Sequence, residues 1–148
     1  MSYVSSYFHC VFRSKERRPF ITQPLRERLW QYLGGIALQN KMKAIEIGGV
    51  EDHVHILLSL PATMPLSKAL QLLKGGSSKW VHDTFPECRL FGWQEKYGAF
   101  SVSMSQLDTI AQYIKGQAGH HRKMTFEEEF LTLLKKHRVA FDEKYLWD

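Results

Sequence analysis

The sequence predicts an α+β fold in which an antiparallel sheet alternates with two helices and is followed by further helices. Three observations support this prediction: period-two hydrophobicity near the N-terminus, two β-rich runs only a few residues apart, and apolar residues at helical spacing elsewhere. The order is βαββαβ and then helices. This is the order of a ferredoxin-like or RRM-like split βαβ sheet with a C-terminal helical extension.

The first half of the chain supplies three strands and one helix. Residues 3–13 alternate as in a half-buried strand, with an apolar side formed by Val4, Phe8, Cys10 and Phe12. The polar side is formed by Ser5, Tyr7, His9 and Arg13. Thr22 is expected to cap a helix that runs to Asn40. The runs 43–50 and 53–60, joined through Glu51 and Asp52, predict a β-hairpin.

The second half supplies the fourth strand and the remaining helices. A helix is expected over residues 65–85, interrupted or loosened at Gly75 and Gly76, because glycine costs a helix interior about 1 kcal/mol relative to alanine. Residues 93–103 predict a strand. Ser105 with Asp108 predicts the capped start of a third helix. A clearer capping box, Thr125 with Glu128, predicts the start of a fourth.

Length, composition and charge limit the class of protein. The 148 residues, 44% hydrophobic, suit a single domain over 1–148, with a core at about 3–122 and a helical extension and tail at about 125–148. Two cysteines are too few for a disulfide framework and favour the cytoplasm. Neither a targeting segment nor a membrane span is expected. A net charge of +5, concentrated in "RSKERRPF" and "GHHRK", favours a polyanionic partner such as nucleic acid.

Two histidines share one face of the predicted third strand. His53 and His55 lie about 6.5 to 7 Å apart along that face, while Val54, Ile56 and Leu58 point to the other side and fill the core. A pair of imidazoles presented in this way suits a divalent metal ion. Two satisfied polar residues on a solvated face would give the same pattern, so the pair alone leaves both interpretations open.

The third helix offers further candidate site residues. Tyr113 and Gln117 lie one turn apart on a flank of its apolar stripe, and His120 or His121 extends that flank. A packing tyrosine beside a solvated glutamine would give the same spacing. Taken with the strand histidines, the split βαβ sheet and the basic surface, the pattern indicates metal-assisted chemistry on a phosphodiester.

Three stretches, "YFHCVFRSKERRPF", "DHVHILLSLP" and "YIKGQ", carry a family resemblance. They resemble the single-tyrosine HUH transposases of the insertion-sequence 200/605 type, including the relatives associated with repetitive extragenic palindromes (REP). The resemblance covers about residues 3–122. It implies that His53 and His55 are the metal-binding pair, that Tyr113 is the nucleophile, and that Gln117 is a third ligand on the helix.

The resemblance also implies an activity. The chain would cleave and rejoin single-stranded DNA at hairpin-flanked ends through a 5′-phosphotyrosine link, with Mg²⁺ or Mn²⁺ as cofactor, although imidazole pairs also suit Zn²⁺. His120 and His121 are candidates for an additional metal or phosphate contact. No nucleotide cofactor is expected, because one phosphodiester replaces another and no Walker-type glycine loop is present. A homodimer is implied, in which a helix loosened at Gly116 and Gly119 lets Tyr113 move between two active sites.

Basic side chains are expected to contact the DNA phosphates, although we expect no more than half of the candidates to do so. The candidates are Arg13, Lys15, Arg17, Arg18, Lys74, Lys79, Arg122 and Lys123. Tyr97 is a candidate for stacking on an unpaired base, whereas core packing is expected for Trp93.

Two other functional classes fit the same residues. One is a non-catalytic nucleic-acid-binding module. The other is a metal-dependent hydrolase, in which a water molecule rather than a tyrosine attacks the phosphodiester. The sequence leaves open the hairpin and cleavage-site sequences, the metal, whether Tyr113 acts in cis or in trans, and whether this copy is mobile or domesticated.

Overall fold

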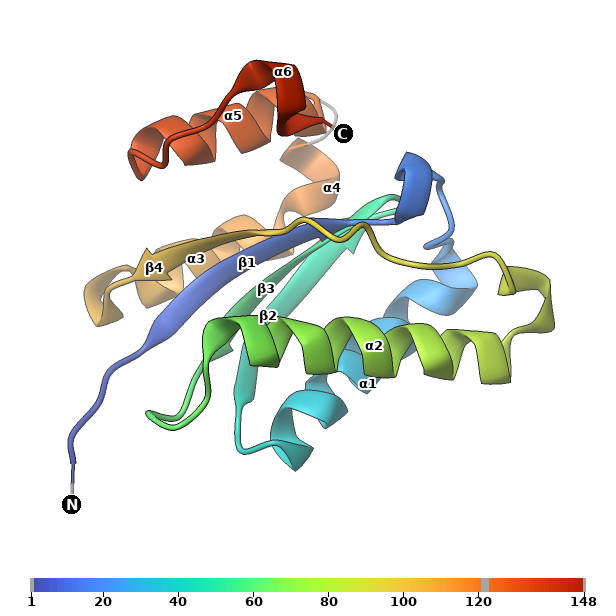
Figure 1. Cartoon of the computed structure of the whole chain (residues 1–148), viewed down its shortest axis with the longest axis horizontal. Coiled ribbons are helices and arrows are strands. Elements are labelled where there is room, and N and C mark those ends of the chain that lie inside the picture. The colour runs from blue at the N-terminus through green and yellow to red at the C-terminus, as the bar shows by residue number, and fades with distance from the viewer. Residues whose placement is uncertain (1, 121–122, 148) are drawn as a thin grey trace. The chain divides into compact units, whose positions relative to one another are not determined.

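Four strands form a single antiparallel sheet in the order β2-β3-β1-β4 (Figure 1). The computed structural model describes residues 2–120 and 123–147, except for the side chain of His120. The strands are β1 (Tyr7–Arg13), β2 (Lys43–Val50), β3 (His53–Ser59) and β4 (Gly98–Val102). The predicted element order βαββαβ and the β2–β3 hairpin are confirmed.

The chain divides into two compact units, Met1–Gln117 and Ala118–Asp148. The first contains the sheet, the helices α1 (Gln23–Gln39), α2 (Leu66–Thr84) and α3 (Leu107–Lys115), and three short 3₁₀ turns, η1 (Lys15–Arg17), η2 (Pro86–Cys88) and η3 (Met104–Gln106). The expectation of one domain over the whole chain stays a prediction. Among the described residues, no helix combines the length and apolarity needed to cross a membrane.

The hydrophobic core fills one side of the sheet, which α1 and α2 cover. Apolar side chains from β1 and β3 pack there against Leu29 and Leu33 of α1 and Leu70 and Leu73 of α2. Burial raises the pKa of the Cys10 thiol in this core to about 12, so this thiol stays protonated and inert at neutral pH. The predicted core role of Cys10 is confirmed.

Strand register separates the core face from the opposite face. Cys10 pairs with Ile56, and these two side chains point into the core, whereas Val11 pairs with His55 and Arg13 with His53. Because side chains alternate along a strand, the odd-numbered residues of β1 and β3 all face away from α1 and α2. The two histidines therefore lie on the face that α3 partly covers.

Helix α2 runs without interruption through Gly75 and Gly76, so the predicted break is wrong. The reason lies in the packing of α2 on α1. A Cβ atom on Gly76 would lie 2.9 Å from Ile36 Cδ1. Glycine here allows the two helices to approach closely, and the resulting burial offsets its low helix propensity.

The predicted capping box at Ser105 and Asp108 is also wrong. Residues 104–106 form the turn η3, in which the Gln106 N–H donates to the Ser103 carbonyl, and α3 begins only at Leu107 without a side-chain cap. Ser105 Oγ lies 2.9 Å from Ser103 Oγ instead. Ser105 is therefore inside the turn rather than at the helix N-cap.

The second unit holds most of α4 (Gln117–His120), followed by α5 (Phe126–Lys136) and α6 (Glu143–Leu146). The predicted capping box is present, with the Glu128 N–H donating to Thr125 Oγ1 over 3.1 Å and the Thr125 N–H donating to the Glu128 carboxylate. The Trp147 ring lies 6.3 Å from that of Phe130. The C-terminal tail therefore packs on α5 within this unit.

Candidate active site

His53 and His55 are fully buried side by side on β3, with ring centroids 5.3 Å apart. The alternative that they are ordinary residues on a solvated face does not agree with this burial. Buried imidazoles need partners for both ring nitrogens. The identity of those partners shows what the two rings can bind.

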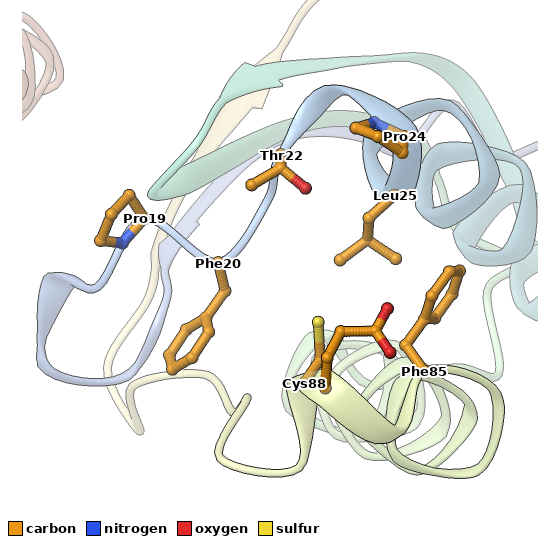
Figure 2. A pocket seen from close by; sticks show the side chains of 8 residues that line it. Pro19, Phe20, Thr22, Pro24, Leu25, Phe85 and Cys88 are labelled. Atoms are coloured by element: carbon orange, nitrogen blue, oxygen red, sulfur yellow. The ribbon is translucent and has the colours of Figure 1, made fainter.

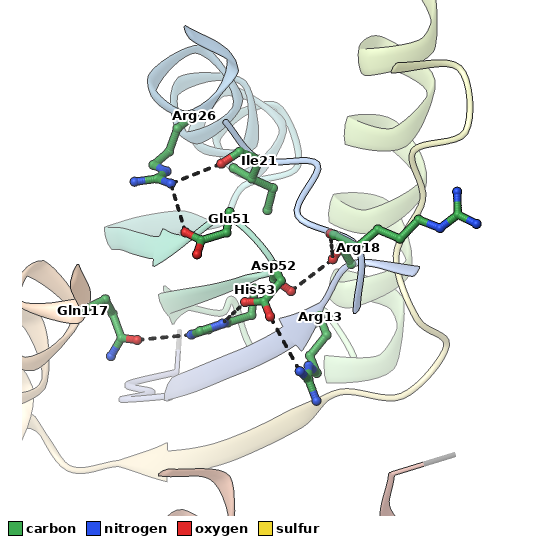
Figure 3. A network of polar contacts seen from close by, with 9 residues as sticks. Arg13, Arg18, Ile21, Arg26, Glu51, Asp52, His53 and Gln117 are labelled. Atoms are coloured by element: carbon green, nitrogen blue, oxygen red, sulfur yellow. Dashed lines mark hydrogen bonds and ion pairs between the residues drawn. The ribbon is translucent and has the colours of Figure 1, made fainter. Parts of the chain in front are cut away.

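Asp52 holds one nitrogen of His53. Its Oδ1 lies 2.9 Å from His53 Nδ1, and its Oδ2 lies 3.6 Å from the Arg13 guanidinium (Figure 3). An ionised carboxylate can only accept hydrogen bonds, so Nδ1 of His53 carries the hydrogen. The neutral ring then presents a lone pair on Nε2, which is the form that ligates a metal ion.

The short turn between β2 and β3 that carries Asp52 is itself anchored. The Ser14 N–H donates to the Asp52 carbonyl, and the Ile21 N–H donates to the Glu51 carbonyl, each over 2.9 Å. Arg26 lies 3.6 Å from the Glu51 carboxylate (Figure 3). These contacts fix the backbone from which the Asp52 side chain reaches His53.

Gln117 faces the other nitrogen of His53. Its Oε1 lies 3.3 Å from His53 Nε2, and its side chain is buried. With the His53 hydrogen on Nδ1, this contact brings together two atoms that both carry lone pairs. It becomes favourable when a cation lies between them, when the ring is protonated, or when the amide turns its NH₂ inward. Two ligands at right angles around Mg²⁺ lie about 3 Å apart, so the donor set and its spacing fit a divalent ion.

Tyr113 lies on α3 beside the histidines. Its ring centroid is 6.0 Å from that of His55 and 5.9 Å from that of His9, and the residue is partly buried. Gly116 ends α3, and Gln117 begins α4. The helix is interrupted at Gly116, as expected, whereas Gly119 lies within α4. The movement of Tyr113 stays a prediction.

Gly48 on β2 allows α3 to lie close to the sheet. It pairs with His55 on the site face, and a Cβ atom at this position would lie 2.3 Å from the Ile114 carbonyl oxygen. That oxygen belongs to the helix backbone and cannot move without moving the helix. The absence of a side chain at residue 48 therefore sets the position of Tyr113, the residue next to Ile114.

Gly48→Ala is expected to lower the free energy of unfolding by roughly 1 to 3 kcal/mol, because α3 must shift outward. Since misplacing a reacting group by about 1 Å can cost about 10²-fold in rate, the cleavage rate of the folded variant should fall by about that factor. Thermal unfolding and single-turnover DNA cleavage measure the two effects. Gly75→Ala is the control, because a Cβ atom there meets nothing within 4 Å. Equal activity of the two variants would contradict this role for Gly48.

Two polar residues of the site were not singled out from the sequence. Asp52 directly precedes His53, and this adjacency was the available signal. His9 was placed on the polar side of the first strand, and its Nε2 lies 2.7 Å from His55 Nδ1. His9, His53 and His55 are all odd-numbered, but only the register of β1 against β3 brings His9 and His55 together.

The predicted DNA-binding residues have different surroundings. Arg13 is buried beside Asp52, and Lys74 donates to the carbonyls of Gln94 and Glu95. Burial of the Lys74 ammonium lowers its pKa. Exposed side chains are found at the remaining described positions: Lys15, Arg17, Arg18, Lys79 and Lys123. His121, Arg122 and the side chain of His120 lie outside the described residues.

Two of the exposed cations have acidic neighbours. Lys79 donates to Asp83 over 2.6 Å, and Arg18 lies 3.6 Å from Glu16. Trp93 packs against the core as predicted, and its indole N–H donates to Ser77. Lys15 and Arg17 are exposed and lie just beyond the end of β1.

Two hollows lie away from the histidines. One, of about 300 Å³, is mostly apolar and is lined by Pro19, Phe20, Pro24, Leu25, Phe85 and Cys88 (Figure 2). The other, of about 970 Å³, lies between α2 and residues 91–97, with Lys15, Lys74 and Tyr97 among its lining residues. Neither is lined by the paired histidines, Tyr113 or Gln117.

Proteins similar to this chain in sequence include DNA transposases. The chain is 28% identical over 115 residues to the ISDra2 transposase TnpA of Deinococcus radiodurans, covering 74% of this chain and 82% of that one. It is 28% identical over 82 residues to the transposase for insertion sequence element IS200 of Salmonella typhimurium. That match spans 55% of this chain and 54% of the relative.

Residues 2–117 match the family model described as "Transposase IS200 like". The chain belongs to the IS200-like transposase family and is therefore an enzyme that acts on DNA.

Solved structures show the same fold. A candidate transposase of Deinococcus radiodurans superposes with a TM-score of 0.66 at 25% identity, covering 79% of this chain and 95% of that one. A REP-associated tyrosine transposase bound to a REP hairpin superposes with a TM-score of 0.62 at 14% identity. The second match covers 96% of this chain and 90% of that one.

Proposed function

We propose that this transposase cleaves and rejoins single-stranded DNA at hairpin-flanked ends, with Tyr113 as the nucleophile and His53, His55 and Gln117 as metal ligands. The observation that carries the proposal is the contact between His53 Nε2 and Gln117 Oε1, 3.3 Å apart within a buried site beside Tyr113. Asp52 supports it by holding His53 in the ligating form. An imidazole nitrogen and an amide oxygen at this spacing can both ligate one divalent ion.

The donor set fits a divalent metal ion, and Mg²⁺ or Mn²⁺ is the proposed cofactor. When bound, the ion would polarise the scissile phosphate and neutralise the charge that develops on it. One amide oxygen and two imidazoles form a mixed set of hard and borderline ligands. Because one phosphodiester is exchanged for another, we propose no nucleotide cofactor.

Tyr113 carries the proposed covalent step. Its hydroxyl oxygen attacks the phosphorus, and the bond from phosphorus to the 3′ oxygen breaks. This leaves a 5′-phosphate linked to the tyrosine and a free 3′-hydroxyl on the other strand segment. A phenol ordinarily ionises near pH 10, so it must lose its proton as it attacks, and the departing 3′ oxygen takes up a proton to become the hydroxyl. Lys115 is not proposed as the base, because its Nζ lies 3.8 Å from Glu46 on β2.

The proposed substrate is a DNA hairpin with an adjoining single strand. Support comes from the net charge of +5 and from the hairpin bound to the REP-associated relative of the same fold. We further propose a homodimer, as the family resemblance implies. We place it in the cytoplasm, because its two cysteines suit a reducing compartment. Lys15, Arg17, Arg18, Lys79, Arg122 and Lys123 are the proposed phosphate contacts. The candidates Arg13 and Lys74 bind within the protein and are proposed to contribute less to DNA binding.

The test is to incubate the protein with labelled single-stranded hairpin DNA and Mg²⁺ or Mn²⁺. The expected result is a DNA–protein adduct that survives denaturation and does not form when EDTA removes the metal. Cleavage without an adduct would instead support a metal-dependent hydrolase. Binding without cleavage would support a non-catalytic DNA-binding module.

Lys15→Ala and Lys74→Met are expected to differ in their effects. Lys15 is exposed, so its loss should weaken DNA binding and reduce the slope of log K against log salt concentration by about 0.7 to 0.9. The Lys74 ammonium binds two backbone carbonyls, so its loss should lower the free energy of unfolding by about 2 kcal/mol. Salt-dependent binding and chemical denaturation measure these effects. Equal salt slopes for both variants would contradict the distinction.

A further inference from the structure

His9 contacts His55 from the neighbouring strand but has no part in the proposed chemistry. The side chain is 1% exposed, and its Nε2 lies 2.7 Å from His55 Nδ1. The two ring planes are inclined by 29°, with centroids 5.0 Å apart. This is a direct hydrogen bond between two buried imidazoles, in which one ring must donate and the other must accept.

The direction of this hydrogen bond decides whether His55 can bind a metal ion. A neutral imidazole carries one hydrogen. If His9 donated, His55 would carry its own hydrogen on Nε2 and would have no lone pair for a metal. If His55 donates from Nδ1, its Nε2 presents a lone pair. Because His9 occupies the Nδ1 side, His55 can serve as a ligand only through Nε2.

We propose that His9 is a positioning residue that accepts the Nδ1 hydrogen of His55 and so holds Nε2 of His55 ready to bind a divalent metal. The inference rests on the proposed function, in which His55 is a ligand. His53 and His55 then have the same arrangement, in which Nδ1 donates to a neighbouring residue and Nε2 faces the metal site. For His53 the neighbouring residue is Asp52. Outer partners of this kind orient a ligating imidazole and fix its tautomer.

A histidine suits this position better than a second carboxylate. Asp52 shares its charge with Arg13 at 3.6 Å, and its side chain is partly exposed. His9 lies deeper, where an unpaired negative charge would carry a large desolvation cost. A neutral imidazole accepts the hydrogen bond without that cost.

Neighbouring residues fix the orientation of the His9 ring. On β4, Phe100 pairs with His9 across the strands, and its ring packs edge-on at 6.3 Å. On the other side, β1 pairs His9 with Leu57, which makes His55 its diagonal neighbour. The pairing of β1 with β3 and β4 therefore fixes the position of the acceptor, His9 Nε2.

The direct test reads the tautomer of His55 in the metal-free protein. Nitrogen-15 NMR of the imidazoles, at a pH well above their ordinary pKa of about 6.5, is expected to show the hydrogen of His55 on Nδ1 and that of His9 on its own Nδ1. A hydrogen on Nε2 of His55 would overturn the proposal. This reading requires neither metal nor DNA, so it is independent of whether the proposed function holds.

Two variants test the consequence for metal binding. His9→Phe keeps a ring but removes the acceptor, and it is expected to lower Mn²⁺ affinity about 10- to 100-fold. His9→Gln places an amide oxygen near the position of Nε2 and should restore most of that affinity. Isothermal titration with Mn²⁺ measures both variants, and thermal unfolding checks that both are folded. Wild-type affinity in a folded His9→Phe variant, or equal losses in both variants, would overturn the proposal.

Discussion

Tyr113→Phe is expected to abolish the DNA–protein adduct and to lower cleavage by at least about 10³-fold, because it removes the attacking oxygen. The ring stays, so its contacts with His9 and His55, at 5.9 and 6.0 Å, are retained. Hairpin affinity, Mn²⁺ affinity and thermal stability should therefore stay close to those of the unaltered protein. A time course of cleavage on labelled hairpin DNA measures the effect.

Tyr97→Phe is the matched control for this change. Tyr97 is 38% exposed and lines the hollow beside α2 rather than the histidine site. The control should form the adduct at the normal rate. If Tyr113→Phe still cleaved DNA at a comparable rate, a water molecule would be the attacking group, and the hydrolase alternative would replace the present proposal.

His53→Ala is expected to eliminate cleavage and to lower Mn²⁺ affinity by more than about 100-fold, while hairpin binding stays within a few-fold. The expected loss of affinity exceeds that for His9→Phe, because His53→Ala removes a metal ligand rather than the hydrogen-bond partner of one. The change also leaves Asp52 without the hydrogen bond from Nδ1 and opens space in a buried site. Some loss of stability, about 1 to 3 kcal/mol, should accompany it.

His53→Asn separates the loss of the metal ligand from the loss of the hydrogen bond to Asp52. The asparagine amide can still donate to Asp52 from near the position of Nδ1, but it has no atom near Nε2. It should therefore fold more stably than His53→Ala and still fail to bind the metal. His82→Ala is the control, because His82 lies on α2 and contacts the Phe91 carbonyl. Full cleavage by folded His53→Asn, or collapse of the fold in both His53 variants, would favour a structural role.

The fold could be predicted because apolar and polar side chains alternate along its strands and the hydrophobic core lies on one side of the sheet. Cys10, Phe12, Val54 and Ile56 repeat with period two, and the pairing of β1 with β3 turns all four toward α1 and α2. The same alternation predicted the common face of the two strand histidines. Local rules failed where packing dominates, as at Gly76, where contact with Ile36 keeps α2 continuous.

The site was less predictable, because its polar contacts depend on register and on side-chain reach. Nothing in the spacing of residues 9 and 55 indicates a hydrogen bond of 2.7 Å between them. The burial of Arg13 beside Asp52 was equally hidden, since a basic residue near the end of a strand is ordinarily solvated. These contacts exist only after the sheet and the turn at Asp52 have formed.

The most direct test of the central claim is to identify the residue that carries the DNA. Tryptic cleavage of the adduct, after nuclease trimming of the DNA, should yield a nucleotide-modified peptide spanning Tyr97–Lys115, which contains both Tyr97 and Tyr113. Tandem mass spectrometry is expected to place the nucleotide on Tyr113. A nucleotide on Tyr97 or on any other residue, or cleavage with no modified peptide, would contradict the proposed mechanism.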